Sequence, residues 1–331
     1  MKQLIFQLAG AAGPSGSETE VRDILSGLLQ PHVDELKVDV LGNLLAWKKG
    51  TANSGKTVLL AANMDEPGVM AIHCEKNGFI RIVPVGSLNP LHLIGERVRF
   101  ANGVLGVIGA AANTSLKDIT FADLYVDIGA ESQAEAAKRL PIGTAGAIDK
   151  PVFQLTENRL AGKSLDNRVG CAVLVEVTSR LGAYPHDLAV LFAAQKEVGS
   201  RGVKAASFKI NADFALTVGA AKAGDMPSAE RSVLSLGIGP AIKVMDRGVV
   251  VPPAIKQRLV DAAERLQIPY QLEVSPDGNS DAGQILLSKD GVPTGGVSIP
   301  VRYGQALLQV ADLRDIELAS RLVLETLQNE R

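Results

Sequence analysis

The chain has 331 residues, of which 46% are hydrophobic and 21% charged, and its formal net charge is -2. This composition supports a large buried core, excludes a disordered chain, and fits about two domains. The balanced charge gives no basic surface for nucleic acid, and two cysteines exclude a disulfide framework. No apolar run reaches the ~20 residues that cross a bilayer. We therefore expect a cytoplasmic protein with neither nucleic acid nor a membrane as a partner.

Helix and strand alternate at the start of the chain. The apolar stretch after Met1 predicts a first helix, and Ser17 and Glu20 have the spacing of a capping box at the start of a second helix. Residues 57–62 form a short continuous apolar run, which is typical of a buried strand.

From Gly68 onward the pattern changes to short strand-like pieces separated by glycines. Asn77-Gly78, between two such pieces, is typical of a tight hairpin turn. This texture continues to about residue 161. It predicts an inserted all-β domain over residues 68–161.

Alternation of strand and helix returns after residue 162. Further strands are predicted at 188–194, 214–218, 270–274 and 297–299. Helices are predicted to begin at Asp166, at Pro253, which suits the first turn of a helix, and at Asp312. Residues 1–67 and 162–331 therefore form one α/β domain, which the all-β segment divides in two.

Polar residues follow the predicted strands, and open α/β sheets bind ligands beyond the carboxyl ends of their strands. The residues at these ends are Asp65, Glu66, Lys196, Glu197, Gly219 and Arg302. Each has a plainer interpretation: Asp65 and Glu66 as a turn, Asp166 as a helix N-cap, Lys196 and Glu197 as a solvated loop pair.

Several other kinds of site find no support in the sequence. Glycine-rich phosphate loops and serine nucleophile elbows are absent. The histidines fall away from the predicted strand ends, and we interpret them as surface or packing residues; they are His32, His73, His92 and His186.

Eight blocks of sequence, in order, point to one family. They are GPSG at 13–16, AANMDEPGVM at 61–70, SLDNRVGCAVL at 164–174, QKEVGSRG at 195–202, AGDMP at 223–227, GIGPAI at 237–242, DGNSDAGQI at 277–285 and GVPTGGVSIPVRY at 291–303. The chain thereby resembles the tetrahedral, dodecamer-forming metallo-aminopeptidases, which include glutamyl and deblocking aminopeptidases and proteins labelled endoglucanase.

The resemblance carries expectations about architecture and partners. It implies a three-layer, aminopeptidase-like (phosphorylase/hydrolase-like) α/β domain interrupted by a β-barrel-like dimerisation domain. It also implies a peptide or small-molecule ligand, and dimers that assemble into a dodecamer. Within the ligand pocket, the residues expected on this basis are Arg302, Tyr303 and Asp281.

Active members of this family hold two divalent metals, usually zinc or cobalt. Carried over position by position, the resemblance implies three retained carboxylates: the catalytic Asp65, the bridging metal ligand Asp166 and the metal ligand Glu197. The other positions are changed: Asn63 and Gln305 replace ligand histidines, Gly219 replaces a ligand aspartate, and Lys196 replaces the general-base glutamate.

These replacements weaken the metal site in consistent ways. Amide oxygens are poor zinc donors and glycine offers none. An ammonium group 4 Å from a unit positive charge costs about 4 kcal/mol at an effective dielectric near 20, and roughly twice that for a dication. A protonated Lys196 also accepts no proton from a water nucleophile.

The sequence thus predicts a homologue without ordinary two-metal peptide hydrolysis and with no cofactor. A residual single zinc or cobalt ion on Asp166 and Glu197 stays open. So do two alternatives: an aminopeptidase with one metal or altered ligands, and a glycoside hydrolase that would use Asp65 and Glu197 roughly 5 to 9.5 Å apart.

Overall fold

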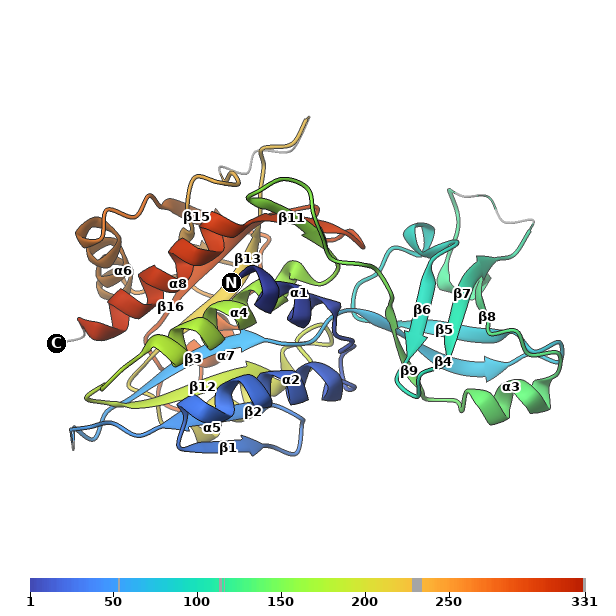
Figure 1. Ribbon diagram of the computed structural model, residues 1–331, viewed down its shortest axis with the longest axis horizontal. Helices are drawn as coiled ribbons and strands as arrows, with labels where there is room; N and C mark the ends of the chain where they lie inside the picture. The colour runs from blue at the N-terminus through green and yellow to red at the C-terminus, as the bar shows by residue number, and fades with distance from the viewer. Residues whose placement is uncertain (53, 113–114, 116, 228–233, 330–331) are drawn as a thin grey trace.

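The computed structural model describes residues 1–52, 54–112, 115, 117–227 and 234–329. The chain forms a larger α/β part, which holds both termini, and a smaller barrel set to one side of it (Figure 1). This architecture confirms the predicted fold class, an α/β chain with a β-barrel-like insertion.

A long mixed sheet forms the middle of the larger part. Its strands lie in the order β1 (Glu35–Val38), β2 (Leu44–Lys48), β12 (Asp187–Ala193), β3 (Thr57–Asn63), β13 (Phe214–Lys222), β16 (Thr294–Arg302), β17 (Gln309–Asp312), β11 (Arg159–Gly162) and β10 (Phe153–Gln154). Off this path, β14 (Ala241–Asp246) pairs with β16 and with β15 (Gln271–Ser275). The four central strands β12, β3, β13 and β16 are parallel, so their carboxyl ends meet at one edge of the sheet.

Helices cover both faces of this sheet and make three layers. One face packs against α1 (Lys2–Gly10), α2 (Thr19–Leu29), α4 (Leu165–Arg180), α6 (Pro253–Arg265) and α8 (Leu313–Gln328). The other face packs against α5 (Arg201–Lys209) and α7 (Ala282–Leu286). The central strands are therefore buried on both sides, which explains their continuous apolar sequences.

The smaller part is a closed barrel. It consists of β4 (Gly68–Cys74), β5 (Ile80–Val85), β8 (Leu124–Asp127), β7 (Leu105–Ala110), β6 (Arg97–Phe100) and β9 (Ala145–Ile148), with α3 (Gln133–Arg139) beside it. The described residues also form three short 3-10 helices: η1 (Gln30–His32), η2 (Pro90–Leu93) and η3 (Phe121–Asp123). The turn between β4 and β5 contains Gly78 at φ 90°, as the Asn-Gly signal predicts.

The C-terminal end of the barrel differs from the boundary expected at residue 161. The last barrel strand ends at Ile148, whereas β10 and β11 pair within the large sheet. Residues 153–161 therefore pair with the larger part and not with the barrel, because an apolar β segment carries no mark of which sheet it joins.

Two local predictions need correction. The capping box at Ser17 and Glu20 does not form, since α2 has Glu18 as its N-cap without a side-chain cap bond. Glu20 instead pairs with Arg99 of β6, at 2.8 Å between Oε2 and Nη1, and so links α2 to the barrel. Gly219 does not end its strand but lies within β13.

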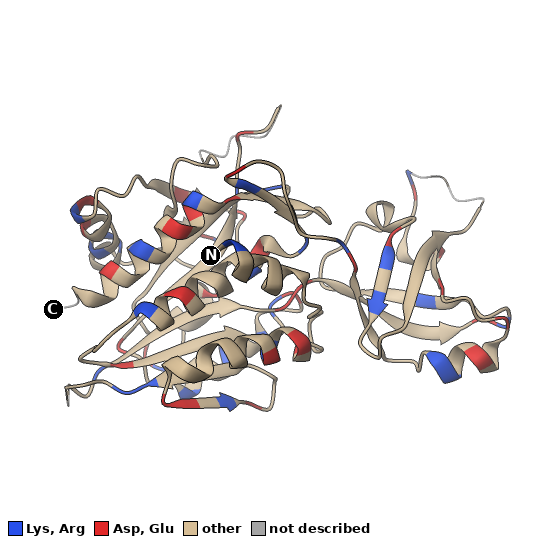
Figure 2. Cartoon of the chain, viewed as in Figure 1, with Lys and Arg blue, Asp and Glu red and all other residues tan. Residues whose placement is uncertain are grey.

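The charge distribution agrees with the composition. In the view of Figure 2, Lys and Arg are interspersed with Asp and Glu over both parts of the chain. Among the described residues, no helix is both long and apolar enough to cross a membrane.

Candidate functional site

The candidate site lies where the central parallel strands end. β3 and β12 are in register with Asn63 opposite Ala193, and β13 and β16 with Gly219 opposite Ser298. The loops after β3 and β12 carry Asp65 and Lys196 into the same region. The convergence predicted from the sequence is therefore present for the loops after β3 and β12.

A cavity of about 650 Å³ opens at this edge of the sheet. Its lining includes the predicted positions Asn63, Asp166, Lys196, Gly219, Asp281, Tyr303 and Gln305. A second cavity of about 210 Å³ adjoins it and shares Asp166, Lys196 and Gln305, with Glu197 and Lys163 added. The volume of the larger cavity is in the range that holds small ligands.

Lys196 interacts electrostatically with a group of carboxylates. Its Nζ lies 3.4 Å from Oε1 of Glu197. The charge of Asp166 is the largest effect on the pKa of Lys196 and raises it above its ordinary value, against the opposing effect of burial. The further carboxylates that raise this pKa are Glu197, Asp281 and Asp65. We call Lys196 with these four carboxylates the Lys196 cluster.

Asp65 is fully buried and held by donors on three sides. Ser15 Oγ and the Glu197 backbone N–H donate to Oδ2, the latter at 3.0 Å, and Asn63 Nδ2 donates to Oδ1 at 3.3 Å. These bonds tie the loop after β3 to the loop after β12. Asp65 is absent from the lining of the cavity.

Asp166 is placed by its backbone. Its N–H donates to Gln309 Oε1 at 2.8 Å, and Gln309 in turn donates to Gly304 O at 2.8 Å. Among the described residues, none donates a hydrogen bond to the carboxylate of Asp166. Asp166 lines both cavities.

Burial perturbs two further carboxyls of the cluster. Burial raises the pKa of Asp281 to about 6, although Lys196 and a hydrogen bond from Ser200 oppose it. Burial likewise raises the pKa of Glu197, although Lys196 acts in the opposite direction. The positive charge of Lys196 therefore does not offset the effect of burial on the pKa values of Glu197 and Asp281.

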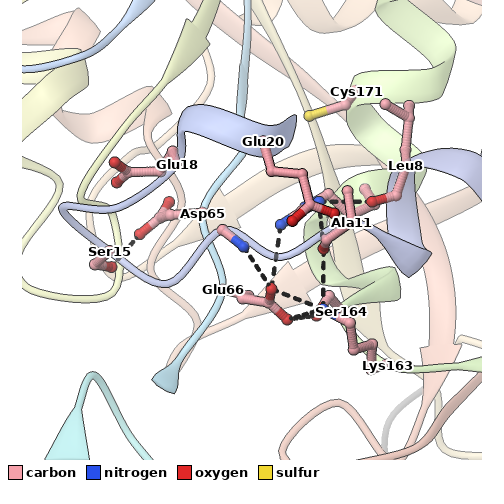
Figure 3. A network of polar contacts seen from close by, with 12 residues as sticks. Leu8, Ala11, Ser15, Glu18, Glu20, Asp65, Glu66, Lys163, Ser164 and Cys171 are labelled. Carbon is pink, nitrogen blue, oxygen red and sulfur yellow. Dashed lines mark hydrogen bonds and ion pairs between the residues drawn. The ribbon is translucent and has the colours of Figure 1, made fainter. Parts of the chain in front are cut away.

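A second buried network lies around Glu66, the residue after Asp65 (Figure 3). Lys163 Nζ lies 2.7 Å from both carboxylate oxygens of Glu66, and Ser164 Oγ donates to the same carboxylate. Burial alone raises the pKa of Glu66, but the charges of Lys163 and Arg168 outweigh it and lower the pKa. Because Glu66 follows Asp65 and Ser164 precedes Asp166 closely, this network fixes two of the site loops.

Backbone strain gathers around the same loops. Four of the non-glycine residues with positive φ flank site residues: Ser164, Gln195, Ser200 and Tyr303, with φ between 50° and 59°. Such conformations cost of order 1–3 kcal/mol each and are found mainly at functional sites. These four backbone conformations set the direction of the chain in the loops that carry the site residues.

The pocket residues expected from the resemblance are placed unequally. Tyr303 and Asp281 line the larger cavity, whereas Arg302 is absent from its lining. Arg302 makes a two-point pair with Asp225, at 2.8 Å from Nε and 2.7 Å from Nη2. Its guanidinium therefore stabilises the loop at 223–227.

Sequence reasoning missed two features of the cavity. His92, on η2 of the barrel, lines it, although the sequence favours a surface or packing role. The far wall holds buried Lys243, which lies 2.5 Å from Oε1 of Glu273, and Ser298 Oγ donates to Oε2 of Glu273 at 2.5 Å. No strand-end rule points to these residues, since only the β14–β16 pairing brings them to the cavity.

The residues present do not fit a pair of divalent metals. Asn63 turns its amide N–H toward Asp65, Gly219 has no side chain, and the Lys196 ammonium lies 3.4 Å from the retained carboxylate of Glu197. Nowhere in the described ranges do three His, Cys, Asp or Glu side chains come together in a metal-binding group. We therefore derive no reaction step through metals.

The sheet, the inserted barrel and the cavity at the strand ends together define a chain of the aminopeptidase class. It belongs to the M42 glutamyl aminopeptidase family, whose sequence model matches residues 42–322.

Individual relatives agree with this assignment. The chain is 33% identical to the lysyl aminopeptidase of Pyrococcus furiosus over 98% of this chain and 96% of the relative. It superposes on an aminopeptidase from the archaeon Desulfurococcus kamchatkensis with a TM-score of 0.93, at 35% identity, covering 99% of this chain and 94% of that one. It also superposes on the Pyrococcus horikoshii TET1 peptidase, which can assemble into a tetrahedron or a large octahedral shell, with a TM-score of 0.89 at 25% identity over 98% of each chain.

Proposed function

We propose that this chain binds a peptide or small-molecule ligand in the cavity of its family and does not carry out two-metal peptide hydrolysis. The observation that supports this proposal is the position of Lys196. Its ammonium lies 3.4 Å from Glu197, and Asp166 is the main source of its raised pKa. A group held protonated in this way neutralises the carboxylates that metals would otherwise need.

The proposal extends to the changed positions. Asn63 and Gln305 supply neutral amides and Gly219 supplies no side chain, so both predicted metal sites lose ligands together with the general base. The retained cavity and the retained acceptors favour a binding protein over a chain that has lost its pocket.

The test combines metal analysis with a peptidase assay. The purified chain is dialysed against zinc or cobalt, its metal content is measured, and aminoacyl anilides are offered as substrates. We expect no stoichiometric metal and no metal-dependent turnover. Metal-dependent turnover that Asp166→Ala abolishes would overturn the proposal.

A reversal variant sharpens this test. Restoring the implied ligands and base by Lys196→Glu, Asn63→His, Gly219→Asp and Gln305→His should produce metal binding that the natural chain lacks. Gly219 has room for the change, because a Cβ there meets nothing within 4 Å.

An aminopeptidase with a single metal is the second candidate. It is favoured by the free acceptor capacity of Asp166, which with Glu197 lines the smaller cavity. The same metal analysis decides between the two candidates. The glycoside hydrolase alternative is disfavoured, because Asp65 is fully buried and would not reach a sugar.

We propose further that the chain is a homo-oligomer, built of dimers that form a dodecamer. The support is the likeness over nearly the whole length to the TET1 peptidase that assembles into closed shells.

A further inference from the structure

Four neighbouring strands, β13, β16, β14 and β15, build the far wall of the larger cavity. Their residues that line it are Thr217, Ser298, Lys243 and Glu273, each at most 5% exposed. The strands are paired so that Thr217 lies opposite Gly296, and a Cβ at Gly296 would be 3.1 Å from Lys243 Cβ and 3.2 Å from Thr217 Oγ1. The glycine therefore lets these side chains pack together. We call Thr217, Ser298, Lys243 and Glu273 the far wall.

Both hydroxyls of the far wall have already donated their protons within the protein. Ser298 Oγ donates to Oε2 of Glu273 at 2.5 Å, and Thr217 Oγ1 donates to Gly295 O at 3.2 Å. A hydroxyl has one proton and two acceptor lone pairs. Among the described residues, none donates to either hydroxyl. What these two side chains offer to the cavity is therefore acceptor capacity.

The charged pair of the far wall is also occupied. Lys243 Nζ lies 2.5 Å from Oε1 of Glu273 and 3.3 Å from Oδ2 of Asp246. Asp246 is in turn held by Ser280, whose Oγ donates to Oδ2 at 2.5 Å. Because the ammonium is shared between two carboxylates, the far wall presents no uncompensated positive charge to a ligand.

Asn167 adds an independent observation at the same end of β13. It lines the larger cavity, is only 2% exposed, and its Nδ2 donates at 2.9 Å to the carbonyl of Val218, the residue after Thr217. Its Oδ1 has no hydrogen-bond partner among the described residues. Buried polar atoms are normally hydrogen-bonded, so this acceptor indicates a place for a donor from a ligand.

From these hydrogen bonds we propose that the far wall binds a neutral side group of a peptide, a primary amide or a hydroxyl, that donates hydrogen bonds to Thr217 and Ser298. This inference rests on the proposed function and specifies the side group of its ligand. It uses none of the positions that the resemblance implies as metal ligands.

Other side groups fit the far wall less well. An anionic group would meet the Glu273 carboxylate and the lone pairs of both hydroxyls. A cationic group would lie beside the buried ammonium of Lys243. An apolar group would cover the hydroxyl oxygens without giving them a donor, and an unpaired buried acceptor is costly. A neutral donor avoids all three conflicts.

The test is calorimetric titration of the full chain after dialysis against a chelator, at pH 7.5. The probes are four tripeptides with side groups of similar size: asparaginyl-, leucyl-, aspartyl- and diaminobutyryl-alanyl-alanine. We expect the asparaginyl peptide to bind at least tenfold more tightly than the other three. Equal or tighter binding of any of those three, or no binding of the asparaginyl peptide, would overturn the inference.

A sugar also carries neutral donors, and cellobiose serves as the probe for that source. We expect it to bind more weakly than the asparaginyl peptide. Tighter binding of cellobiose would place the donors on a sugar and overturn the assignment to a peptide side group.

A matched pair of threonine variants locates the effect. Thr217→Val keeps the shape of the side chain and removes the acceptor, so it should weaken binding of the asparaginyl peptide at least fivefold. Thr178→Val makes the same change outside the cavity, at a buried threonine of α4 whose hydroxyl donates to Leu174 O at 2.7 Å, and should change affinity less than twofold. Thermal unfolding checks that both variants are folded. Unchanged affinity in Thr217→Val would overturn the inference.

Glu273→Gln reverses the polarity of the far wall. The new amide group would donate to Ser298 Oγ, which frees the hydroxyl proton for the cavity, and Lys243 would lose one of its two carboxylates. We expect the affinity for the aspartyl peptide, relative to the asparaginyl peptide, to rise at least tenfold. An unchanged ratio in a folded variant would contradict the role given to Glu273.

The failure of this inference differs from the failure of the proposed function. Metal-dependent turnover of aminoacyl anilides would contradict the proposed function, and the preference among the peptides would still be measurable on the metal-free chain. Absent turnover together with no preference among the peptides would leave the proposed function standing and reject the assignment of the far wall.

Discussion

Asp281 is a carboxyl whose burial works against stability at neutral pH. Its pKa is raised from 3.8 to about 6 in the folded chain, first by burial. Between these values the folded state binds a proton that the unfolded state has released. Stability therefore falls as pH rises from about 4 to 6, and the loss is complete above that window. The groups that face Asp281 electrostatically are Lys196, Asp65 and Glu197.

Asp281→Asn should remove this pH-dependent loss. We expect it to raise the free energy of unfolding by about 1–3 kcal/mol at pH 8, because a shift of one pKa unit corresponds to about 1.4 kcal/mol. At pH 4 the two proteins should be equally stable. Chemical denaturation at both pH values measures the difference, with Asp290→Asn as the exposed control. A gap that is the same at both pH values would contradict this account.

Gly219 tests whether the fold keeps room for a lost side chain. A Cβ at this position meets nothing within 4 Å, and the residue lies in β13 without a positive φ. We expect Gly219→Ala to change the free energy of unfolding by less than about 1 kcal/mol, the span of strand propensities.

Gly202 is the matched contrast to Gly219. A Cβ there would lie 2.2 Å from Ala194 O and 2.2 Å from Asn43 Oδ1. Gly202→Ala should therefore cost about 1–3 kcal/mol or more, as overpacking does. Thermal unfolding of the two variants checks both values. If the two variants were destabilised equally, a side chain at position 219 would have no more room than one at position 202.

At the residue scale, the sequence predicts positions better than contacts. Asp65, Asp166 and Lys196 lie at one edge of the sheet because strand ends converge there, which the run of apolar residues before each loop reveals. The contact of Arg302 with Asp225 leaves no such mark, since a guanidinium pairs with whichever carboxylate the fold brings near. For the same reason the sequence does not predict that His92, which belongs to the barrel, lines the cavity.

At the element scale, the Glu66–Lys163 pair joins the loop after β3 to the start of α4. Lys163 also donates to Ala11 O at 3.0 Å, which extends the link to the segment after α1. Both side chains of the pair are at most 5% exposed, so removing one partner leaves a buried charge.

Lys163→Met should therefore lower the free energy of unfolding by about 3–5 kcal/mol. Arg180→Met removes one partner of an exposed pair, with Glu176 at 3.4 Å, and should cost less than about 1 kcal/mol. Urea denaturation of the two variants gives the comparison. A cost for Lys163→Met as small as that for Arg180→Met would show that the buried pair contributes little.

Element boundaries depend on partners that lie far away in the sequence. Asp312 caps α8 as predicted, because its side chain accepts from Arg314 N–H within the same turn. Glu20 does not complete a capping box, because α2 begins at Thr19 with Glu18 as its N-cap, and its carboxylate pairs with Arg99 of the barrel instead. Asp312 keeps its cap although it also pairs with the distant Arg159, at 2.9 Å from Nε.

At the scale of the whole molecule, the alternation of strand and helix predicts the three-layer domain, since central parallel strands need helices on both faces. The inserted barrel is evident from its glycines and its Asn-Gly turn. Its C-terminal limit is not, because β10 and β11 resemble barrel strands in composition and pair within the large sheet.

The barrel also leaves large apolar side chains on its outside. Leu105 and Val107 of β7 are 50% and 52% exposed. In a homo-oligomer built through the barrel, these side chains would be covered at an interface between copies. We expect the natural chain to have a mass several times that of the monomer by light scattering after size exclusion. The double variant Leu105→Asp and Val107→Asp should shift it to smaller species, because charges at an apolar contact oppose association.

Phe208 provides the matched comparison for this assembly. It is 65% exposed on α5, on the larger part of the chain and outside the barrel. Phe208→Asp should leave the mass unchanged if β7 forms the contact, although it also replaces an exposed apolar side chain by a charged one. A natural chain that is monomeric, or an assembly that Phe208→Asp disrupts and the β7 variant does not, would move the interface away from this face of the barrel.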